Sequence, residues 1–213
     1  MVNVHAAFQR NPLITDHLSL NMDLFNYSRR ESSEVNIGAT PLGGNHPIRI
    51  QSMTNTVTMD TEACVEQAKR IINAGGEYVR LTTQGVREAE NLRNINIGLR
   101  SQGYDTPLVA DVHFNPKVAD VAAQYAEKVR INPGNYVDPG RTFRKLEYTD
   151  EEYAQEIAKI RARFVPFLNI CKENHTAIRI GVNHGSLSDR IMSHYGDTPE
   201  GMVESCMEFL RIC

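Results

Sequence analysis

The sequence predicts an α/β fold built from repeated βα units. Five short runs rich in Val and Ile recur along its 213 residues, and each is followed by a stretch with helical spacing. Strands that alternate with helices form a parallel sheet, because each helix returns the chain to the edge where the next strand starts. Eight such units close a TIM barrel of about 250 residues. We therefore expect the first five βα units of a (βα)8 barrel, an incomplete barrel.

The expected strands are the apolar runs at 48–53, 78–82, 108–113, 128–132 and 177–181. A short β-hairpin precedes the first of them, because residues 35–38 and 46–48 flank the turn-forming sequence Pro-Leu-Gly-Gly at 41–44. We divide the chain into an N-terminal extension at 1–34 and a partial TIM-barrel domain at 35–213.

A helix follows each strand, and the helix ends carry the residues that such ends favour. The expected helices cover 60–74, 86–101, 116–127, 149–171 and 198–213. Asn115 caps the third helix ahead of a proline at its first position, and Thr149 starts a capping box on the fourth. Pro166 is expected to kink the fourth helix or divide it. The last helix reaches Cys213 without a stop signal, so we expect the chain to be part of a longer one.

Composition and charge exclude several classes of protein. The chain has 23 Lys and Arg against 26 Asp and Glu, a net charge of −3, which argues against nucleic-acid binding. No apolar run approaches the length of about 20 residues that spans a bilayer, and residues 1–30 lack the apolar core of a signal peptide. Four cysteines without a CxxC pair indicate a reducing compartment. We expect a cytoplasmic protein that binds neither nucleic acid nor a membrane.

Three of the expected strands carry an arginine between two apolar residues, at Arg80, Arg130 and Arg179. Successive side chains of a strand point to opposite faces, and the apolar neighbours face the helices. The arginines therefore point to the other face, which is the interior of a barrel. The same alternation brings further polar residues to the C-terminal ends of the strands, where barrel enzymes bind their ligands: Asn132, Asn183, Asp111 and His113.

Three guanidinium groups in one interior require counter-charge, because an unpaired buried charge costs several kcal/mol. Asp111 supplies one negative charge, and the remaining surplus predicts a polyanionic ligand, most simply a phosphate or diphosphate. The loops at 132–135 and 181–186 contain glycine and are able to turn backbone N–H groups toward such an anion. The alternative is an internal network in which Glu77 and Glu127 neutralise the arginines.

Other reactive side chains have less specific interpretations. Gln51 and Ser52 end the first strand with hydrogen-bonding groups at the same rim, but no base is indicated for the serine, so no catalytic residue is assigned. Asp111 and His113 lack two further ligands for a metal ion, so hydrogen bonding to substrate or to an arginine is favoured. The cysteines lie on helix patterns and are interpreted as core residues: Cys64, Cys171, Cys206 and Cys213.

Four motifs stand at the ends of the expected strands: QSMTNT at 51–56, VADVHF at 109–114, VRINPGN at 129–135 and IRIGVNHGSL at 178–187. Together they closely resemble the hydroxymethylbutenyl diphosphate synthase family, the iron–sulfur enzymes of the methylerythritol phosphate (MEP) route to isoprenoids. The similarity runs in order and in spacing from about Tyr27 to Cys213. The stretch at 136–175 and the run at 186–192 are similar to the larger, plant-like form, which carries an inserted domain further along.

The resemblance implies an oxidoreductase that converts 2-C-methyl-D-erythritol 2,4-cyclodiphosphate to 4-hydroxy-3-methylbut-2-enyl diphosphate by reductive dehydroxylation. It implies a TIM barrel that holds this cyclic diphosphate and a C-terminal domain that binds a 4Fe-4S cluster through three Cys and one Glu. Ferredoxin or flavodoxin supplies the electrons. The substrate-phosphate arginines of the family correspond to Arg80, Arg130 and Arg179, with Asn132, Asn183, Asp111 and His113 nearby.

The chain departs from the family in lacking the cluster ligands, the later barrel strands, the lysine expected on the sixth strand, and the inserted and iron–sulfur domains. We therefore expect it to bind the diphosphate, to hold no cofactor and no metal, and to be inactive alone. Two other interpretations stay open. A pterin-binding barrel of the dihydropteroate synthase kind also has a leading hairpin and polar strand ends, although three arginines suit a diphosphate better. A non-catalytic fragment would pair with another copy through its open sheet edges and form a homo-oligomer.

Overall fold

The computed structural model describes residues 31–138 and 147–213, so most of the expected N-terminal extension lies outside the described residues. Five strands form one parallel sheet in the order β1-β2-β3-β4-β5. They are β1 (Gln51–Met53), β2 (Tyr78–Thr83), β3 (Leu108–Val112), β4 (Lys128–Ile131) and β5 (Ala177–Ile180). Each strand pairs with the one before it, and β1 does not pair with β5. This arrangement confirms the five predicted βα units and the incomplete barrel.

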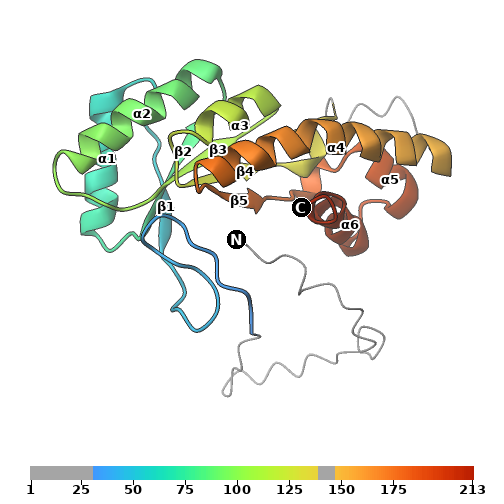
Figure 1. The fold of residues 1–213 in the computed structure, drawn as a ribbon, viewed down its shortest axis with the longest axis horizontal. Coiled ribbons are helices and arrows are strands. Elements are labelled where there is room, and N and C mark those ends of the chain that lie inside the picture. The colour runs from blue at the N-terminus through green and yellow to red at the C-terminus, as the bar shows by residue number, and fades with distance from the viewer. Residues whose placement is uncertain (1–30, 139–146) are drawn as a thin grey trace.

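Helices α1 to α4 lie along one face of the sheet, and the segment ahead of β1 lies on the other (Figure 1). The helices are α1 (Thr61–Asn73), α2 (Val86–Arg100), α3 (Pro116–Ala122), α4 (Asp150–Glu173), α5 (Asp189–Tyr195) and α6 (Pro199–Leu210). The side chains of Asp60, Asn115 and Thr149 accept hydrogen bonds from first-turn N–H groups, so the predicted caps on α3 and α4 are confirmed.

The helices differ from the expected ones in α3, α4 and α5. α3 ends at Ala122, earlier than expected, because turns at 123–125 lead the chain into β4. Pro166 does not divide α4, which continues as one helix of 24 residues, since a proline removes only one hydrogen bond from its ladder. α5 was missed altogether. Its N-cap, Ser188, is a clear start signal, but seven residues are too few to display a helical period.

The predicted hairpin exists in a different register. Val35 and Leu42 form its antiparallel bridge, so the turn lies between them, at 38–39, rather than at 41–44. Gly38 has a φ of +53°, a left-handed conformation that glycine adopts without strain. Gly43 and Gly44, in the segment predicted to form the turn, follow the bridge instead.

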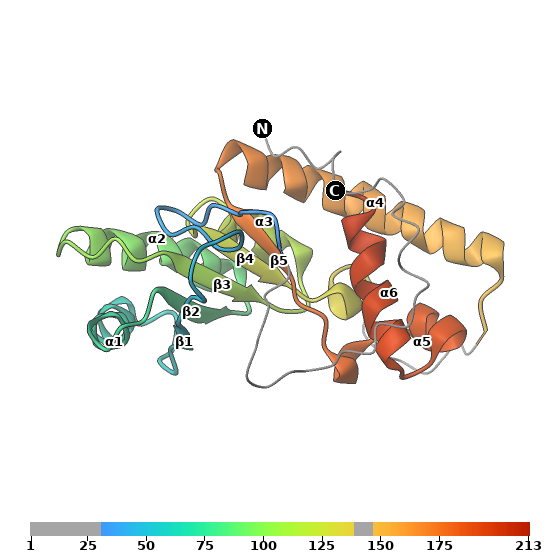
Figure 2. The same ribbon diagram turned by 90° about the horizontal axis from the view of Figure 1, so that it is seen from below.

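The hairpin closes the inner face of the sheet at the N-terminal ends of the strands. Seen from below, it crosses the strands (Figure 2). Ile37, which is 1% exposed, packs there with Tyr78 and Val109. The Tyr78 hydroxyl donates a hydrogen bond of 2.7 Å to the carbonyl of Thr40. This end of the inner face is therefore filled by side chains, and the C-terminal strand ends remain for a ligand.

The opposite face of the sheet packs against the helices and forms the main core. The strand residues that face the helices are buried: Val79, Leu81, Leu108, Ala110, Val112, Val129 and Ile131. They alternate with the polar residues of the inner face, as the sequence predicts. No helix in the described ranges is long and apolar enough to cross a membrane.

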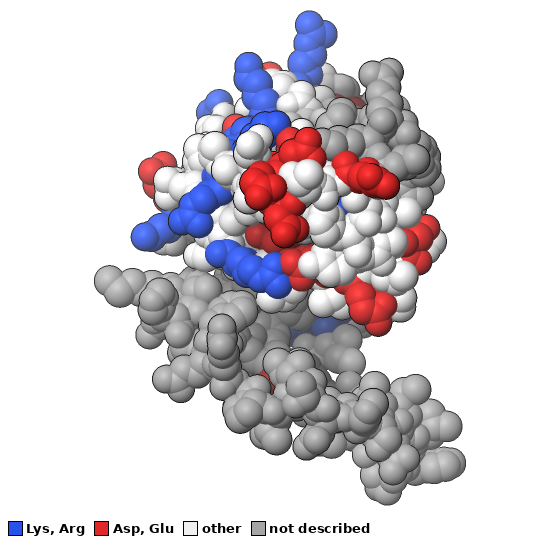
Figure 3. All heavy atoms as spheres, turned by 90° about the vertical axis from the view of Figure 1, so that its right-hand side faces the viewer, with Lys and Arg blue, Asp and Glu red and all other residues white. Residues whose placement is uncertain are grey.

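The surface carries charges of both signs. Acidic side chains gather on the end of the molecule that lies to the right in Figure 1, with Lys and Arg side chains around them (Figure 3). The N-terminus of α4 lies at that end, and its first turn contains Asp150, Glu151 and Glu152. Acidic residues in the first turn stabilise a helix through its dipole, so these three carboxylates have a structural role in α4.

Candidate anion-binding site

The register of the strands brings the predicted polar residues together on the inner face. Asp111 on β3 is the partner of Thr82 on β2 and of Arg130 on β4. Arg130 is in turn the partner of Arg179 on β5. Arg80 lies two residues before Thr82 and points to the same face. The three arginines and Asp111 thus occupy one face of four neighbouring strands.

Asp111 is the shared counter-charge of two of these arginines. Its carboxylate accepts hydrogen bonds from Arg80 Nη2 at 2.5 Å and from Arg130 Nη1 at 3.2 Å. His113 Nε2 lies 3.2 Å from the same carboxylate and 3.5 Å from Arg130 Nη1. With 4% of its side chain exposed, Asp111 forms charge-assisted hydrogen bonds from which water is largely excluded.

Arg130 is the most firmly held of the arginines. It is 7% exposed, and Nη2 donates a hydrogen bond of 2.6 Å to the carbonyl of Gly181. A Cβ at Gly181 would lie 2.1 Å from Arg130 Nε, so this approach requires glycine. Burial lowers the pKa of Arg130 and the Asp111 carboxylate opposes that effect, but the guanidinium remains charged.

Positive charge on this face exceeds the negative charge available. Arg179 is exposed and forms no hydrogen bond or ion pair with any described residue. Nε of Arg80 is buried without a hydrogen-bond partner in the same part of the chain. Asp111, the single carboxylate of this group, is already shared. The face therefore retains donors and charge for an anionic ligand.

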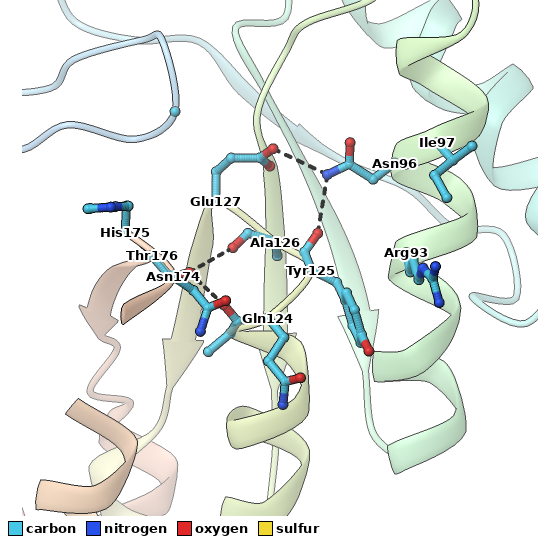
Figure 4. A pocket seen from close by; sticks show the side chains of 12 residues that line it. Arg93, Asn96, Ile97, Gln124, Tyr125, Ala126, Glu127, Asn174, His175 and Thr176 are labelled. Carbon is cyan, nitrogen blue, oxygen red and sulfur yellow. Dashed lines mark hydrogen bonds between the residues drawn. The ribbon is translucent and has the colours of Figure 1, made fainter. Parts of the chain in front are cut away.

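The internal network that was the alternative explanation is wrong for both of its proposed carboxylates. Glu77 pairs with Arg49 at 2.7 Å. Glu127 pairs with Arg100 at 2.8 Å and also accepts a hydrogen bond from Asn96. Figure 4 shows Glu127 and Asn96 at the wall of a hollow of about 400 Å³, which lies at the N-terminal ends of β4 and β5. Both carboxylates thus neutralise arginines outside the inner-face group.

Asn132 and Asn183 organise the loops that follow β4 and β5. Asn132 Oδ1 accepts from the N–H of Gly134, and Asn183 Oδ1 accepts from the N–H of Gly185. Asn132 Nδ2 also donates a 2.7 Å hydrogen bond to Ser186 Oγ, which joins the two loops. Two N–H groups expected to face an anion are therefore bonded within their own loops, and the side chains of the arginines are the better donors.

Gln51 and Ser52 do not join this group. Gln51 is the register partner of Tyr78 and Ser52 that of Val79. Ser52 thus shares the helix-facing side with Val79 and lines a hollow beside α1, so its predicted place at the ligand rim is wrong. Gln51 faces inward, but at the level of Tyr78, which is four residues before Thr82 on β2. The placement of β1 depends on pairing with β2 rather than on its own short apolar pattern.

Lys128 is an inner-face cation that the sequence analysis missed. It starts β4 two residues before Arg130 and is 8% exposed. Its ammonium lies 5.4 Å from the centroid of the Tyr78 ring. The alternation that revealed Arg130 applies equally to Lys128 and would have found it.

The described residues contain no group of three or more His, Cys, Asp or Glu side chains arranged to hold a metal ion. Cys64 and Cys171 are buried, in agreement with their interpretation as core residues. Cys206 is partly exposed, and Cys213 is exposed because α6 ends at Leu210 rather than continuing through 213.

Comparison with known proteins places these features in a family. The profile of the GcpE TIM-barrel domain matches residues 32–213. This match confirms the resemblance found in the four motifs and the TIM-barrel fold class. It also decides against the pterin-binding alternative.

Curated relatives from several bacteria carry the name 4-hydroxy-3-methylbut-2-en-1-yl diphosphate synthase (flavodoxin). The relative from Phocaeicola vulgatus is 97% identical over 192 residues, which cover 90% of this chain and 31% of its own length. The Bacteroides thetaiotaomicron relative is 90% identical over the same shares. That of Chlorobaculum tepidum is 50% identical over 89% of this chain and 25% of its own length. The chain thus spans about a third of the length of the first two.

Among solved structures, dihydropteroate synthase from Burkholderia cenocepacia aligns over 84% of this chain and 88% of its own, with 12% identity and a TM-score of 0.42. The enzyme from Vibrio fischeri aligns over 76% of this chain and 72% of its own, with 13% identity and a TM-score of 0.38.

Proposed function

The chain belongs to the GcpE TIM-barrel family, and from that premise we propose that it is the diphosphate-binding part of a 4-hydroxy-3-methylbut-2-en-1-yl diphosphate synthase. One observation carries the proposal: Arg80, Arg130 and Arg179 share one face of the sheet with a single carboxylate, Asp111. Guanidinium groups match phosphate oxygens in geometry as well as in charge, and a diphosphate supplies the negative charge that this face lacks.

The proposed substrate is 2-C-methyl-D-erythritol 2,4-cyclodiphosphate, which the whole enzyme opens and dehydroxylates reductively in isoprenoid biosynthesis. Arg130, fixed by Asp111 and Gly181, provides a donor that is already oriented before the ligand binds. Arg179 has no partner among the described residues and is available to approach a phosphate oxygen. In this proposal, the contribution of the chain is to anchor the diphosphate and orient the bond that breaks.

The family's 4Fe-4S cluster does not fit the residues that the structure describes. Cys64 and Cys171 are buried in helices, and no cluster of three metal-ligating side chains occurs in the described ranges. We therefore assign no redox step to these residues, and propose that the chain alone does not turn over. For the whole enzyme we propose flavodoxin or ferredoxin as electron donor. The names of the relatives include the word flavodoxin, which supports this part of the proposal. We also propose that the protein works in the cytoplasm.

Isothermal titration with inorganic pyrophosphate tests the proposed binding. We expect Arg179→Ala to weaken binding at least tenfold without loss of fold, because its side chain is exposed and has no described partner. Arg130→Ala should weaken it further. Arg161→Ala, at an exposed position of α4, is the control and should bind like the wild type. Equal affinity in the wild type, Arg179→Ala and Arg130→Ala would refute the proposed site.

A further inference from the structure

Lys128 lies on the inner face, level in the strand register with Arg80 and one inner-face position before Arg130 and Arg179. It precedes Arg130 by two residues on β4, and its register partners are Val109 on β3 and Ala177 on β5. All of these side chains point to the inner face, and Lys128 is 8% exposed. A long cationic side chain is thus held inside the sheet. Lysine side chains normally extend their ammonium group into water instead.

Arginines outnumber carboxylates three to one among the groups that face Lys128. The titratable and charged side chains that β2, β3, the loop after β3, β4 and β5 direct to this region are Tyr78, Arg80, Asp111, His113, Arg130 and Arg179. The single carboxylate, Asp111, bonds Arg80 and Arg130. No hydrogen bond or ion pair joins Lys128 to a residue in 31–138 or 147–213. Burial, with repulsion from Arg179 and Arg80, lowers its pKa.

The contact with Tyr78 does not account for this lysine. A cation–π contact at 5.4 Å offsets only part of the cost of burying an ammonium group, and it is weaker than a buried ion pair. Tyr78 is already anchored through its hydroxyl to Thr40, so it needs no lysine to fix it. A polyanion bound to the arginines would supply the missing counter-charge to Lys128 as well.

We propose that Lys128 is a fourth cation of the anion site, which supports the bound diphosphate from the hairpin side and takes up a proton when the ligand binds. The inference rests on the proposed function, because the same ligand is bound by the arginines. A bound polyanion favours the ammonium form over the neutral amine, and so raises the pKa of Lys128 toward its ordinary value. Binding therefore draws a proton from solvent at alkaline pH, and affinity falls as pH rises. An arginine at this position would show no such change, because guanidinium does not deprotonate.

The experiment is isothermal titration of the 213-residue chain with inorganic pyrophosphate at neutral and alkaline pH. Paired buffers of different ionisation enthalpy report the number of protons taken up. The variants are Lys128→Met, which preserves most of the side-chain volume without the charge, and Lys128→Arg, which keeps the charge permanently. Lys172→Met, at an exposed position in the last turn of α4, is the control.

We expect Lys128→Met to bind pyrophosphate about tenfold more weakly than the wild type at neutral pH, which corresponds to about 1.4 kcal/mol. Lys128→Arg should retain its affinity and take up fewer protons at alkaline pH. Lys172→Met should match the wild type. Protonation of pyrophosphate itself is common to all four proteins and cancels in the comparison.

The outcomes separate this inference from the proposed function. If Arg179→Ala weakens binding while Lys128→Met and Lys128→Arg behave like the wild type, the role of Lys128 is overturned and the arginine site stands. If the wild type itself does not bind pyrophosphate, both fall. Thermal unfolding verifies the fold of each variant. Should Lys128→Met fail to fold, proton uptake in Lys128→Arg equal to that of the wild type overturns the inference by itself.

Discussion

Replacing Asp111 with asparagine removes the charge that Arg80 and Arg130 share and leaves the side-chain volume nearly unchanged. The two N···O distances are 2.5 and 3.2 Å, and 4% of the aspartate side chain is exposed. Removing one partner of a buried ion pair costs about 3–5 kcal/mol, because the other charge is left unpaired. The Arg80 side chain is 22% exposed and can be partly hydrated. We therefore expect the lower end, a decrease of about 3 kcal/mol in the free energy of unfolding.

Urea unfolding followed by circular dichroism measures this decrease. Saturating pyrophosphate should shrink the difference between variant and wild type, because the ligand replaces the lost negative charge. Asp120→Asn is the matched control: Asp120 pairs with Arg163 at 2.6 Å, but these side chains are 24% and 29% exposed. We expect Asp120→Asn to lower the free energy of unfolding by no more than about 1 kcal/mol, and pyrophosphate should not change this decrease. The reasoning is refuted if Asp111→Asn lowers the free energy of unfolding by less than about 1 kcal/mol, or if pyrophosphate leaves the decrease unchanged.

Two further predictions concern packing and burial. In Gly181→Ala the new Cβ would lie 2.1 Å from Arg130 Nε, so we expect a destabilisation of about 1–3 kcal/mol in urea unfolding and weaker pyrophosphate binding. Gly185→Ala is the control, because the nearest atom to its new Cβ would lie 3.6 Å away, and it should change neither stability nor pyrophosphate binding. A similar loss of stability in both variants would argue against the contact with Arg130. Burial raises the pKa of Cys171 to about 12, so at pH near 8 a thiol reagent should modify exposed Cys213 first and Cys171 only after denaturation. Modification of Cys171 in the native protein would contradict its burial.

Side-chain alternation predicts the inner face well wherever a strand is central in the sheet. In β2, β3 and β4 the residues on the helix side are apolar except for Thr83 at the end of β2, so a single Arg or Asp identifies the other face. β1 has only three residues and lies at an edge, and Ile48 and Ile50 before it are 74% and 61% exposed. An apolar run without a buried face gives no reliable register. For this reason the sequence predicts Ser52 at the ligand rim, although the pairing with β2 turns it to the helix side.

Local sequence patterns do not predict contacts between residues that are distant in the sequence. Arg190 lies in the polar segment that forms α5, yet it is 1% exposed. It pairs with Glu208 of α6 at 2.7 Å and with Asp138 of the loop after β4 at 3.1 Å. Each of these three residues is of a charged type that usually lies on the solvent-exposed surface. Their burial follows from the packing of α5 and α6 beside that loop, which no spacing rule within one element reveals.

The cations of the inner face differ in how much freedom they retain, and this difference assigns them different tasks. Arg130 is fixed by Asp111 and Gly181, so it loses little conformational entropy when a ligand binds. Arg179 is exposed and without a described partner, so it must become ordered on binding, which costs entropy but lets it follow a phosphate that moves. Lys128 is fixed in place by burial, and only its protonation remains adjustable. Substitution of Arg130 should therefore affect the position of the ligand, and substitution of Arg179 chiefly its rate of release.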